Sequence, residues 1–244
     1  MNVRVGLAGR DLGEILPLLR QKGFEVTDKN PSLFITYGGD GSLVGAERQF
    51  PGVPKVPIRS SQVCKRCPEH EPQAILDRLL AEKLESQPFL KVEMRHKGMT
   101  KIGMNEVGFH MANPASAVRF NLYVNDRPYV HGDIIADGLI FATPFGSTAY
   151  FRAVTHGTFR EGTGLAIVSS VNPIEWAVLH AMDRVRVEIV RGPAMALADN
   201  DPDQWKLSSG DTLELGAHPQ PARILGFDAL TCQECELKDR RPQR

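Results

Sequence analysis

The sequence lacks the features that point to a macromolecular or membrane partner. Lysine plus arginine and aspartate plus glutamate number 29 each, so the formal net charge is +0. No overall field therefore attracts nucleic acid or an anionic membrane surface. No apolar run approaches the ~20 residues that a membrane-spanning helix requires, and the first residues lack the apolar stretch of a signal peptide. We expect a cytoplasmic enzyme, with neither nucleic acid nor a membrane as its partner.

Helical and strand-like patterns alternate over residues 3–87, and strand-like patterns dominate afterwards. The first stretch predicts strands at 3–7 and 33–37 and helices at 12–19 and 75–84, with Pro17 near the start of its helix or at a bend in it. The second stretch predicts a hairpin turn at Asn125-Asp126 and strands at 101–104, 118–124, 139–143, 163–171, 184–190, 195–198 and 211–215. The chain is therefore expected to form an α/β domain over 1–88, followed by a β-rich domain over 89–217.

A glycine-rich segment, residues 38–42 (Gly-Gly-Asp-Gly-Ser), follows the predicted strand 33–37 directly. Loops at the carboxyl ends of α/β strands are where such sheets bind ligands. Glycines let backbone N–H groups approach a phosphate closely, and Asp40 among them can orient or deprotonate a hydroxyl, or hold a metal ion. The plainer interpretation is a Gly-Asp turn between two elements, and this motif alone leaves both open.

Two further segments combine groups that suit a nucleotide. Residues 137–150 (DGLIFATPFGSTAY) place a strand before a turn with hydroxyls, backbone amides and the Tyr150 ring, which can bind a ribose and pack on a base. Asn105-Glu106 follows another short strand and supplies an amide and a carboxylate. An amide side chain matches the donor and acceptor edge of adenine. No Gly-x-x-x-x-Gly-Lys-Ser/Thr loop occurs, which excludes a P-loop kinase.

These three segments, in this order and at this spacing, resemble the NAD kinase family. The Gly-Gly-Asp-Gly motif is shared with lipid kinases and phosphofructokinases, whereas the Thr-Pro-x-Gly-Ser-Thr-Ala-Tyr segment is far more specific to NAD kinases. The resemblance implies a small Rossmann-like α/β domain, a β-sandwich-like second domain with NAD in the crevice between them, and a final segment, 218–244, that returns to the first domain. It also implies a homodimer or homotetramer.

The resemblance assigns a role to each matching position. Asp40 is the expected catalytic carboxylate facing the adenosine 2′-hydroxyl, and Gly39 and Gly41 leave room for phosphate. Asn105 is expected to bind adenine, and Glu106 and Asp137 to hold the nicotinamide-side ribose. The remaining expected NAD-binding residues surround the adenosine or line the site: Thr148, Ala149, Tyr150 and Asp199. A divalent cation such as Mg²⁺ is expected on the phosphates of the donor nucleotide.

The sequence departs from the family near the donor side. Arg59 stands where the family has asparagine in a Gly-x-Asn-x-Gly segment, and Phe145 replaces a small hydroxyl residue. These changes leave open the donor, which is ATP, another triphosphate or polyphosphate, and the preference for NAD or NADH. A non-catalytic NAD- or nucleotide-binding regulator on the same fold is the alternative, and a lipid kinase is a weaker one.

The four cysteines form two Cys-x-x-Cys pairs, Cys64 with Cys67 and Cys232 with Cys235. Two such pairs are the usual ligand set of a structural tetrahedral zinc site. A chain end that returns to the first domain would let the distant pairs meet. The alternatives are two local redox pairs, a long-range disulfide, four free thiols or an iron–sulfur cluster.

Overall fold

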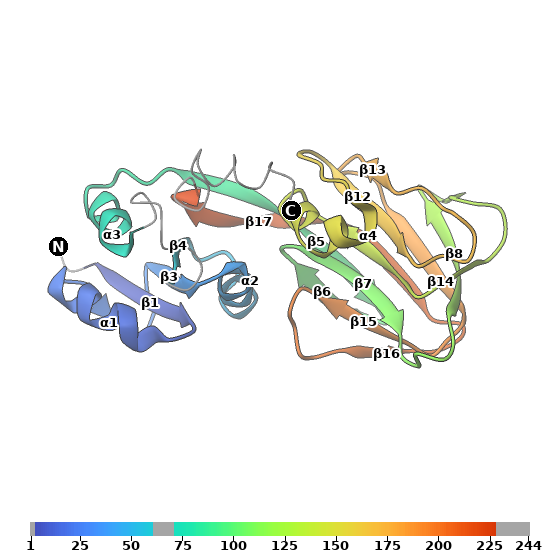
Figure 1. Cartoon of the computed structure of the whole chain (residues 1–244), viewed down its shortest axis with the longest axis horizontal. Helices are drawn as coiled ribbons and strands as arrows, with labels where there is room; N and C mark the ends of the chain where they lie inside the picture. The colour runs from blue at the N-terminus through green and yellow to red at the C-terminus, as the bar shows by residue number, and fades with distance from the viewer. Residues whose placement is uncertain (1–2, 61–70, 228–244) are drawn as a thin grey trace, which may run out of the picture. The chain divides into compact units, whose positions relative to one another are not determined.

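The computed structural model describes residues 3–60 and 71–227. They form two compact units, one up to Phe89 together with the part from Ala222 onward, and the other over Leu90–Pro221 (Figure 1). Strands β5 (Ser86–His96) and β17 (Thr212–Leu225) belong partly to each unit. The chain thus enters the second unit along β5 and leaves it along β17.

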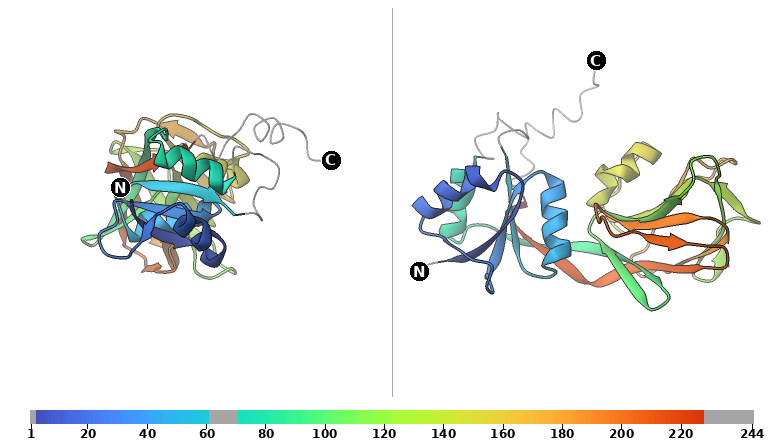
Figure 2. Two further views of the ribbon diagram at one scale, coloured as in Figure 1. Left: turned by 90° about the vertical axis from the view of Figure 1, so that its left-hand side faces the viewer. Right: turned by 90° about the horizontal axis from the view of Figure 1, so that it is seen from below.

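The first unit is a parallel sheet with helices on both faces (Figure 2). Its remaining elements are β1 (Arg4–Gly9), α1 (Leu12–Gln21), β2 (Glu25–Val26), β3 (Leu33–Gly38), α2 (Asp40–Gln49), β4 (Lys55–Arg59) and α3 (Pro72–Leu80). The strand order is β2-β1-β3-β4, and Ile224 of β17 lies parallel beside Lys55 of β4. This arrangement confirms the expected Rossmann-like α/β unit.

The burial of the strand residues shows that helices cover both faces of this sheet. Residues 33–37 of β3 are all buried, as expected for a central parallel strand between two helical layers. Helices α1 and α3 contribute Ile15, Leu19, Ile75 and Leu76 to one hydrophobic cluster with the strands. The buried residues of α2 lie outside that cluster, and α2 contacts β1, β3 and β4. Helix α2 therefore covers the other face.

The second unit is a sandwich of two sheets. Its remaining elements are β6 (Met99–Gly103), β7 (Glu106–Met111), β8 (Val118–Val124), β9 (Arg127–Pro128), β10 (Ile134–Ala136), β11 (Gly138–Ala142), the 3₁₀ turn η2 (Gly146–Thr148), α4 (Tyr150–Thr155), β12 (Thr163–Val168), β13 (Ala177–Leu179), β14 (Val185–Arg191), β15 (Ala194–Ala198) and β16 (Trp205–Leu207). One sheet has the order β10-β8-β14-β17, with β5 beside β17, β6 beside β5 and β9 beside β8. The other has the order β13-β12-β11-β7-β15-β16.

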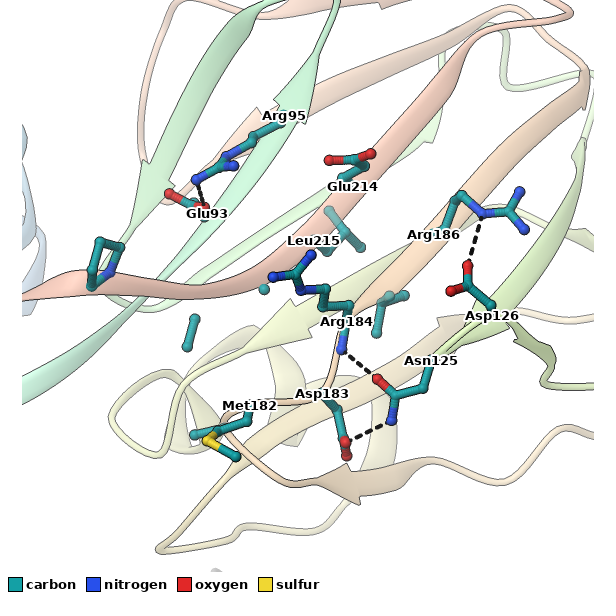
Figure 3. Close-up of a pocket in the computed structure, with 15 residues that line it drawn as sticks. Glu93, Arg95, Asn125, Asp126, Met182, Asp183, Arg184, Arg186, Glu214 and Leu215 are labelled. Carbon is teal, nitrogen blue, oxygen red and sulfur yellow. Dashed lines mark hydrogen bonds and ion pairs between the residues drawn. The ribbon is translucent and has the colours of Figure 1, made fainter.

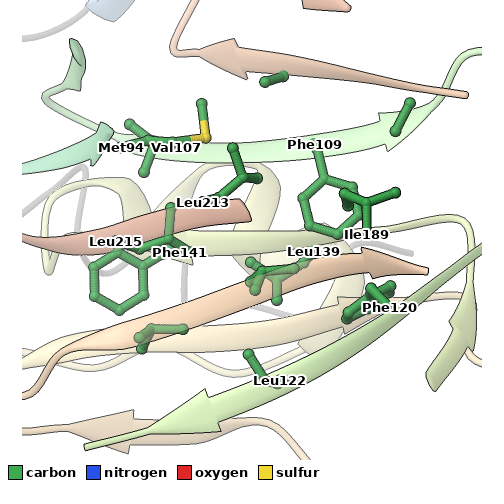
Figure 4. Close-up of a cluster of buried hydrophobic side chains, with 14 of the residues drawn as sticks. Met94, Val107, Phe109, Phe120, Leu122, Leu139, Phe141, Ile189, Leu213 and Leu215 are labelled. Atoms are coloured by element: carbon green, nitrogen blue, oxygen red, sulfur yellow. The ribbon is translucent and has the colours of Figure 1, made fainter. Parts of the chain in front are cut away.

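The two sheets meet in a single buried cluster (Figure 4). Phe120 of β8 and Phe109 of β7 cross edge to face there, with ring centroids 5.0 Å apart. Val118, Phe120 and Leu122 alternate with more exposed residues along β8, so one face of the strand points into the core. The expected β-sandwich is confirmed, because period-two patterning buried one face of each sheet.

Several predicted elements are longer or shorter than expected. Helix α3 ends at Leu80, and Leu84 packs into the core beyond it. Strand β12 ends at Val168 rather than at Val171, because Ser169 adopts a left-handed conformation with φ 50°. The predicted strand 211–215 is only the first part of β17, which continues to Leu225.

Two local expectations concern prolines and turns. Pro17 lies inside α1 on its exposed side. Of its two expected positions, the one near the helix start is wrong, and a bend at Pro17 stays a prediction. The proline cannot donate a hydrogen bond to the Gly13 carbonyl, which is tolerable where water can replace it. The hairpin at Asn125-Asp126 is confirmed, since both residues have positive φ, 50° and 63°, between β8 and β9. Within the described ranges, no helix is long and apolar enough to cross a membrane.

Candidate functional site

Asp40 is the first residue of α2, directly after strand β3 and two glycines. The expectation that residues 38–42 form a loop is therefore wrong, because Asp40, Gly41 and Ser42 already belong to the helix. Gly38 has φ 136°, and a Cβ there would lie 2.4 Å from Ser42 Oγ. Only glycine permits this tight entry into the helix. The exposed Asp40 carboxylate thus stands at the N-terminus of a ten-residue helix, where the N–H groups of the first turn point toward a ligand.

Neighbouring strands bring other groups to the same sheet edge. Gly38 of β3 pairs with Arg59 of β4, and Gly9 of β1 pairs with Tyr37. Because these strands are parallel, their carboxyl ends meet at one edge. Asp40 and Arg59, the residue that departs from the family pattern, therefore belong to the same edge of the first unit.

In the second unit, Asp199 holds a turn of the main chain. Its Oδ2 accepts a hydrogen bond from the backbone N–H of Met104 at 2.7 Å, and its Oδ1 accepts from those of Asn105 and Glu106 at 2.7 and 3.0 Å. Its own N–H donates to the Glu106 carbonyl at 2.9 Å. Asp199 and the predicted pair Asn105-Glu106 are thus brought together, although 93 or more residues separate them in sequence.

Glu106 carries a buried carboxylate. The residue is 7% exposed, and its Oε2 has no hydrogen-bond partner among the described residues. Burial, and secondly the negative charge of Asp199, raise its pKa to about 7. An unsatisfied buried carboxylate costs stability, so its retention points to a ligand that donates hydrogen bonds to it.

Tyr150 and Asp137 lie within electrostatic reach of this region, and His110 neighbours both of them. The pKa of Tyr150 is raised by burial and by the charges of Asp137 and Glu106, which places all three within electrostatic reach of one another. The pKa of His110 is lowered by burial, partly offset by Asp137, so the ring is neutral at pH 7. The His110 and Tyr150 rings lie 5.5 Å apart, centroid to centroid. Asp137 and Tyr150 were predicted to belong to the site, whereas His110 was missed.

The position of His110 follows from strand periodicity. Val107 and Phe109 point into the sandwich core, so Glu106, Gly108 and His110 lie on the opposite face of β7. The paired residues Ala142, Ile140 and Gly138 of β11 lie on this same face. The sequence Glu-Val-Gly-Phe-His could have revealed His110 had 106–111 been recognised as a strand. On β11 this face is covered, because Ile140 and Ala142 are buried against Phe151 of α4, whereas His110 of β7 stays partly exposed.

The predicted ribose- and base-binding turn is built on Thr143. Its Oγ donates to the Met104 carbonyl at 2.6 Å and accepts from the Gly146 N–H at 3.0 Å, while its N–H donates to the Asn105 carbonyl at 2.8 Å. This lays the turn against the Asn105 segment. Thr148 and Ala149 are exposed beside it, and Tyr150, 39% exposed, begins α4.

A separate hollow of about 730 Å³ in the second unit contains none of the predicted residues (Figure 3). Most of the charged groups named here form ion pairs or hydrogen bonds with other residues that line the hollow. Arg95 pairs with Glu93 at 2.5 Å, Arg186 lies 3.9 Å from Asp126, and Asn125 bridges the side chain of Asp183 and the N–H of Arg184. The contacts of Asn125 and Asp126 join the turn after β8 to β14 and to the residues just before it, so we assign the hollow no ligand.

The predicted zinc ligands Cys64, Cys67, Cys232 and Cys235 all lie outside the described residues. Within the part of the chain that the structure describes, no three His, Cys, Asp or Glu side chains gather to hold a metal ion.

The segments of the second unit that carry the candidate site also match known proteins in sequence. Residues 104–158 match the family model of the ATP-NAD kinase C-terminal domain. The NAD kinase of Saccharolobus islandicus (strain M.14.25 / Kamchatka #1) is 29% identical over 153 residues, which cover 62% of this chain and 59% of that protein. The NAD kinase of Hyphomonas neptunium is 27% identical over 205 residues, covering 77% and 78%. The matched part thus spans about three-fifths of the Saccharolobus relative.

Solved structures share the fold across both units. A yeast NADH kinase complexed with NADH superimposes with a TM-score of 0.79 at 14% identity, covering 100% of this chain and 90% of that one. An NAD kinase from Archaeoglobus fulgidus in complex with ATP gives 0.73 at 18% identity, covering 91% and 92%. The family model covers the turn 143–148 and the Asn105-Glu106 pair, the two segments that the hydrogen bonds of Thr143 join. The chain is thus similar in sequence to NAD kinases over part of its length, and it shares the fold of the solved NAD(H) kinase structures.

Proposed function

We propose that this protein is an NAD kinase, which transfers a phosphoryl group from a nucleotide donor to the adenosine 2′-hydroxyl of NAD and so forms NADP. The observation that carries the proposal is the exposed carboxylate of Asp40 at the start of α2, directly after two glycines. A protein that only bound NAD would not need a carboxylate there.

The chemistry assigned to the chain is proton transfer and positioning. Asp40 accepts the 2′-hydroxyl proton as the new O–P bond forms, while the bond from the γ-phosphorus to the donor's bridging oxygen breaks and leaves a nucleoside diphosphate. The N-terminus of α2 stabilises phosphate charge. A divalent cation bound by the donor phosphates would neutralise further charge. Among the carboxylates assigned to the site, that of Asp40 is the exposed one, and it would face this cation.

NAD is assigned to the second unit, beside Glu106, Asp137 and the turn 143–148. Asn105 binds adenine, Glu106 and Asp137 accept hydrogen bonds from the nicotinamide-side ribose, and Thr148, Ala149 and Tyr150 surround the adenosine. The unpartnered Oε2 of Glu106 supports this assignment, since ribose hydroxyls are donors. Gly39 and Gly41 leave room for phosphate. The donor is ATP, another triphosphate or polyphosphate.

The direct test is to incubate the protein with magnesium, NAD or NADH, and each donor in turn, and to detect NADP or NADPH with an NADP-specific dehydrogenase. We expect NADP from NAD and ATP. Saturable NAD binding without any product would instead support the non-catalytic regulator. Phosphorylation of diacylglycerol would support the lipid kinase.

We also propose that Cys64, Cys67, Cys232 and Cys235 bind one structural zinc ion. Thiolates at this spacing place two sulfurs at ~2.3 Å from a metal, and two pairs complete a tetrahedron. Reduced thiols suit the cytoplasm, where we place the protein. We expect about one zinc per chain by elemental analysis, and Cys232→Ser should lower the Tm because metal binding contributes to folding. A chelator should lower the Tm of the wild type equally. No metal together with four titratable thiols would refute the site, and a disulfide between the pairs would replace it.

We further propose a homodimer or homotetramer with two-fold symmetry, as is usual for soluble homo-oligomers. Sedimentation at micromolar concentration should give a mass at least twice the 27.0 kDa of one chain. An active monomer would contradict the proposal.

A further inference from the structure

The carboxylate of Asp199 is committed to the protein's own main chain. Three consecutive backbone N–H groups, those of Met104, Asn105 and Glu106, donate to its two oxygens at 2.7–3.0 Å. A carboxylate offers roughly four acceptor positions, so most of its capacity is used. The expectation that Asp199 binds NAD directly therefore has little geometric support.

The surrounding backbone is shaped to admit this carboxylate. A Cβ at Gly103 would lie 2.2 Å from the Glu106 carbonyl oxygen and 3.0 Å from Asp199 Oδ1, so only glycine allows the chain between β6 and β7 to close around it. Asp199 itself adopts a left-handed conformation with φ 47°, which is uncommon for a residue other than glycine and costs ~1 kcal/mol or more. Such a conformation persists where the neighbouring contacts require it.

A second anchor fixes the loop that follows Asp199. Lys101 of β6 donates from Nζ to Asp201 Oδ2 at 3.0 Å and to the Asp203 carbonyl at 2.5 Å. The same Nζ lies 5.0 Å from the centre of the Trp205 ring. The loop 199–205 is therefore fastened to β6, which holds the Asp199 carboxylate in place.

From this geometry we infer that Asp199 is a positioning residue. It holds the main chain of residues 104–106 and so presents the side chains of Asn105 and Glu106 to the dinucleotide. The inference rests on the proposed NAD-binding role of these two residues. Asp199 itself touches neither the reacting oxygen nor the transferred phosphoryl group.

A pH dependence of NAD binding follows from the charges that face Glu106. The carboxylates are those of Asp199, at the end of β15, and Asp137, before β11, and the phenol of Tyr150 on α4 lies near them. His110 lies on the same face of β7, and Lys101 of β6 pairs with Asp201. With a raised pKa of about 7, Glu106 is protonated below that pH and charged above it. Ribose hydroxyls donate better to a carboxylate than to a carboxylic acid. NAD affinity should therefore rise as the pH increases through about 7.

Asp199→Asn tests the inference because it keeps the side chain's size. The amide oxygen can still accept two N–H groups, whereas the amide nitrogen cannot accept the third, and the charge is lost. Without that charge the pKa of Glu106 falls, so the midpoint of NAD binding against pH, measured by calorimetry, should move below that of the wild type. Above pH 8, where Glu106 is charged in both proteins, loss of its positioning should raise the KM for NAD about 10-fold, with kcat within about 3-fold of wild type, as for loss of a ~1.4 kcal/mol binding contribution.

Two companion variants separate the possible outcomes. Glu106→Gln should remove the pH dependence between pH 6 and 8, because it removes the titrating group. Asp133→Asn, at an exposed aspartate just before β10 in the same unit, should behave as wild type. If Asp199→Asn unfolds, amide hydrogen exchange of the wild type must still show strong protection at residues 104–106, and rapid exchange there would overturn the inference.

The failures are distinguishable. Wild-type protein that binds no NAD at any pH would contradict the proposed function itself. Wild-type binding with an Asp199→Asn midpoint and KM unchanged would overturn the positioning role alone. A fall of kcat by 100-fold or more at an unchanged midpoint would overturn it as well, and would assign Asp199 to the chemical step.

Discussion

Replacing Asp40 by asparagine should lower turnover by at least ~100-fold, the usual effect of losing a general acid–base group. The substitution keeps the size of the side chain at the start of α2 and removes both the proton acceptor and the charge. The fold should be unaffected, because Asp40 is exposed and the tight entry into α2 depends on Gly38 rather than on it. NAD binding should survive, since the residues assigned to it belong to the other unit.

A matched control exists at the same sheet edge. Asp11 is exposed, follows β1 as Asp40 follows β3, and makes no side-chain hydrogen bond that caps α1. Asp11→Asn should therefore keep wild-type kcat and KM in the coupled NADP assay. Nearly wild-type turnover of Asp40→Asn would refute its catalytic role, and equal losses in both variants would indicate a general effect of charge at this edge.

The sequence predicted the fold class well because period and composition carry that information locally. The alternation in 118–124 and the mostly apolar run 33–37 each identified a strand, and both proved to face a core as expected. Element ends were less accurate. The continuation of β17 was missed because Gly216, Pro219 and Pro221 look like a loop, although a strand tolerates them where its ladder is incomplete.

The same distinction applies to the site, where residues in local motifs were predicted but contacts between distant segments were not. The family resemblance pointed to Glu106, Asp137 and Tyr150, which the structure places within electrostatic reach of one another. It could not give the hydrogen bonds of the Asp199 carboxylate, because the three amides that donate to it come from the turn between β6 and β7 and the first residue of β7, far away in sequence. Nor could it give the burial of Glu106, which depends on the packing of β7 between β11 and β15. Tertiary contacts determine both properties.

The second large effect is expected from a substitution of Gly146, in the turn that lies against Asn105. Gly146 approaches the main chain so closely that an added Cβ would lie 2.0 Å from the Asn105 carbonyl oxygen and 2.6 Å from its Cα. Both neighbours are backbone atoms that cannot rotate away. Gly146→Ala must therefore push the turn off the 104–106 segment and break the hydrogen bonds by which Thr143 joins them.

We expect Gly146→Ala to destabilise the protein by about 3 kcal/mol, the upper range for overpacking a tight contact, and to weaken NAD binding at least ~10-fold, since displacement of Asn105 and Glu106 costs their contacts. Denaturant unfolding and calorimetry with NAD measure the two effects. Gly45→Ala in α2 is the control, because a Cβ there meets nothing within 4 Å. Alanine in a helix should raise its stability by up to ~1 kcal/mol.

A milder variant tests the same contact without a steric clash. Thr143→Val keeps the shape of the side chain but removes the Oγ that donates to the Met104 carbonyl and accepts from the Gly146 N–H. Leaving these buried groups unpaired should cost roughly 1–3 kcal/mol. NAD affinity should fall in the same order as stability, Gly146→Ala below Thr143→Val below wild type. If both variants unfold at the wild-type denaturant concentration and bind NAD normally, the turn does not hold the Asn105 segment, and the adenosine-binding surface must be sought elsewhere on the second unit.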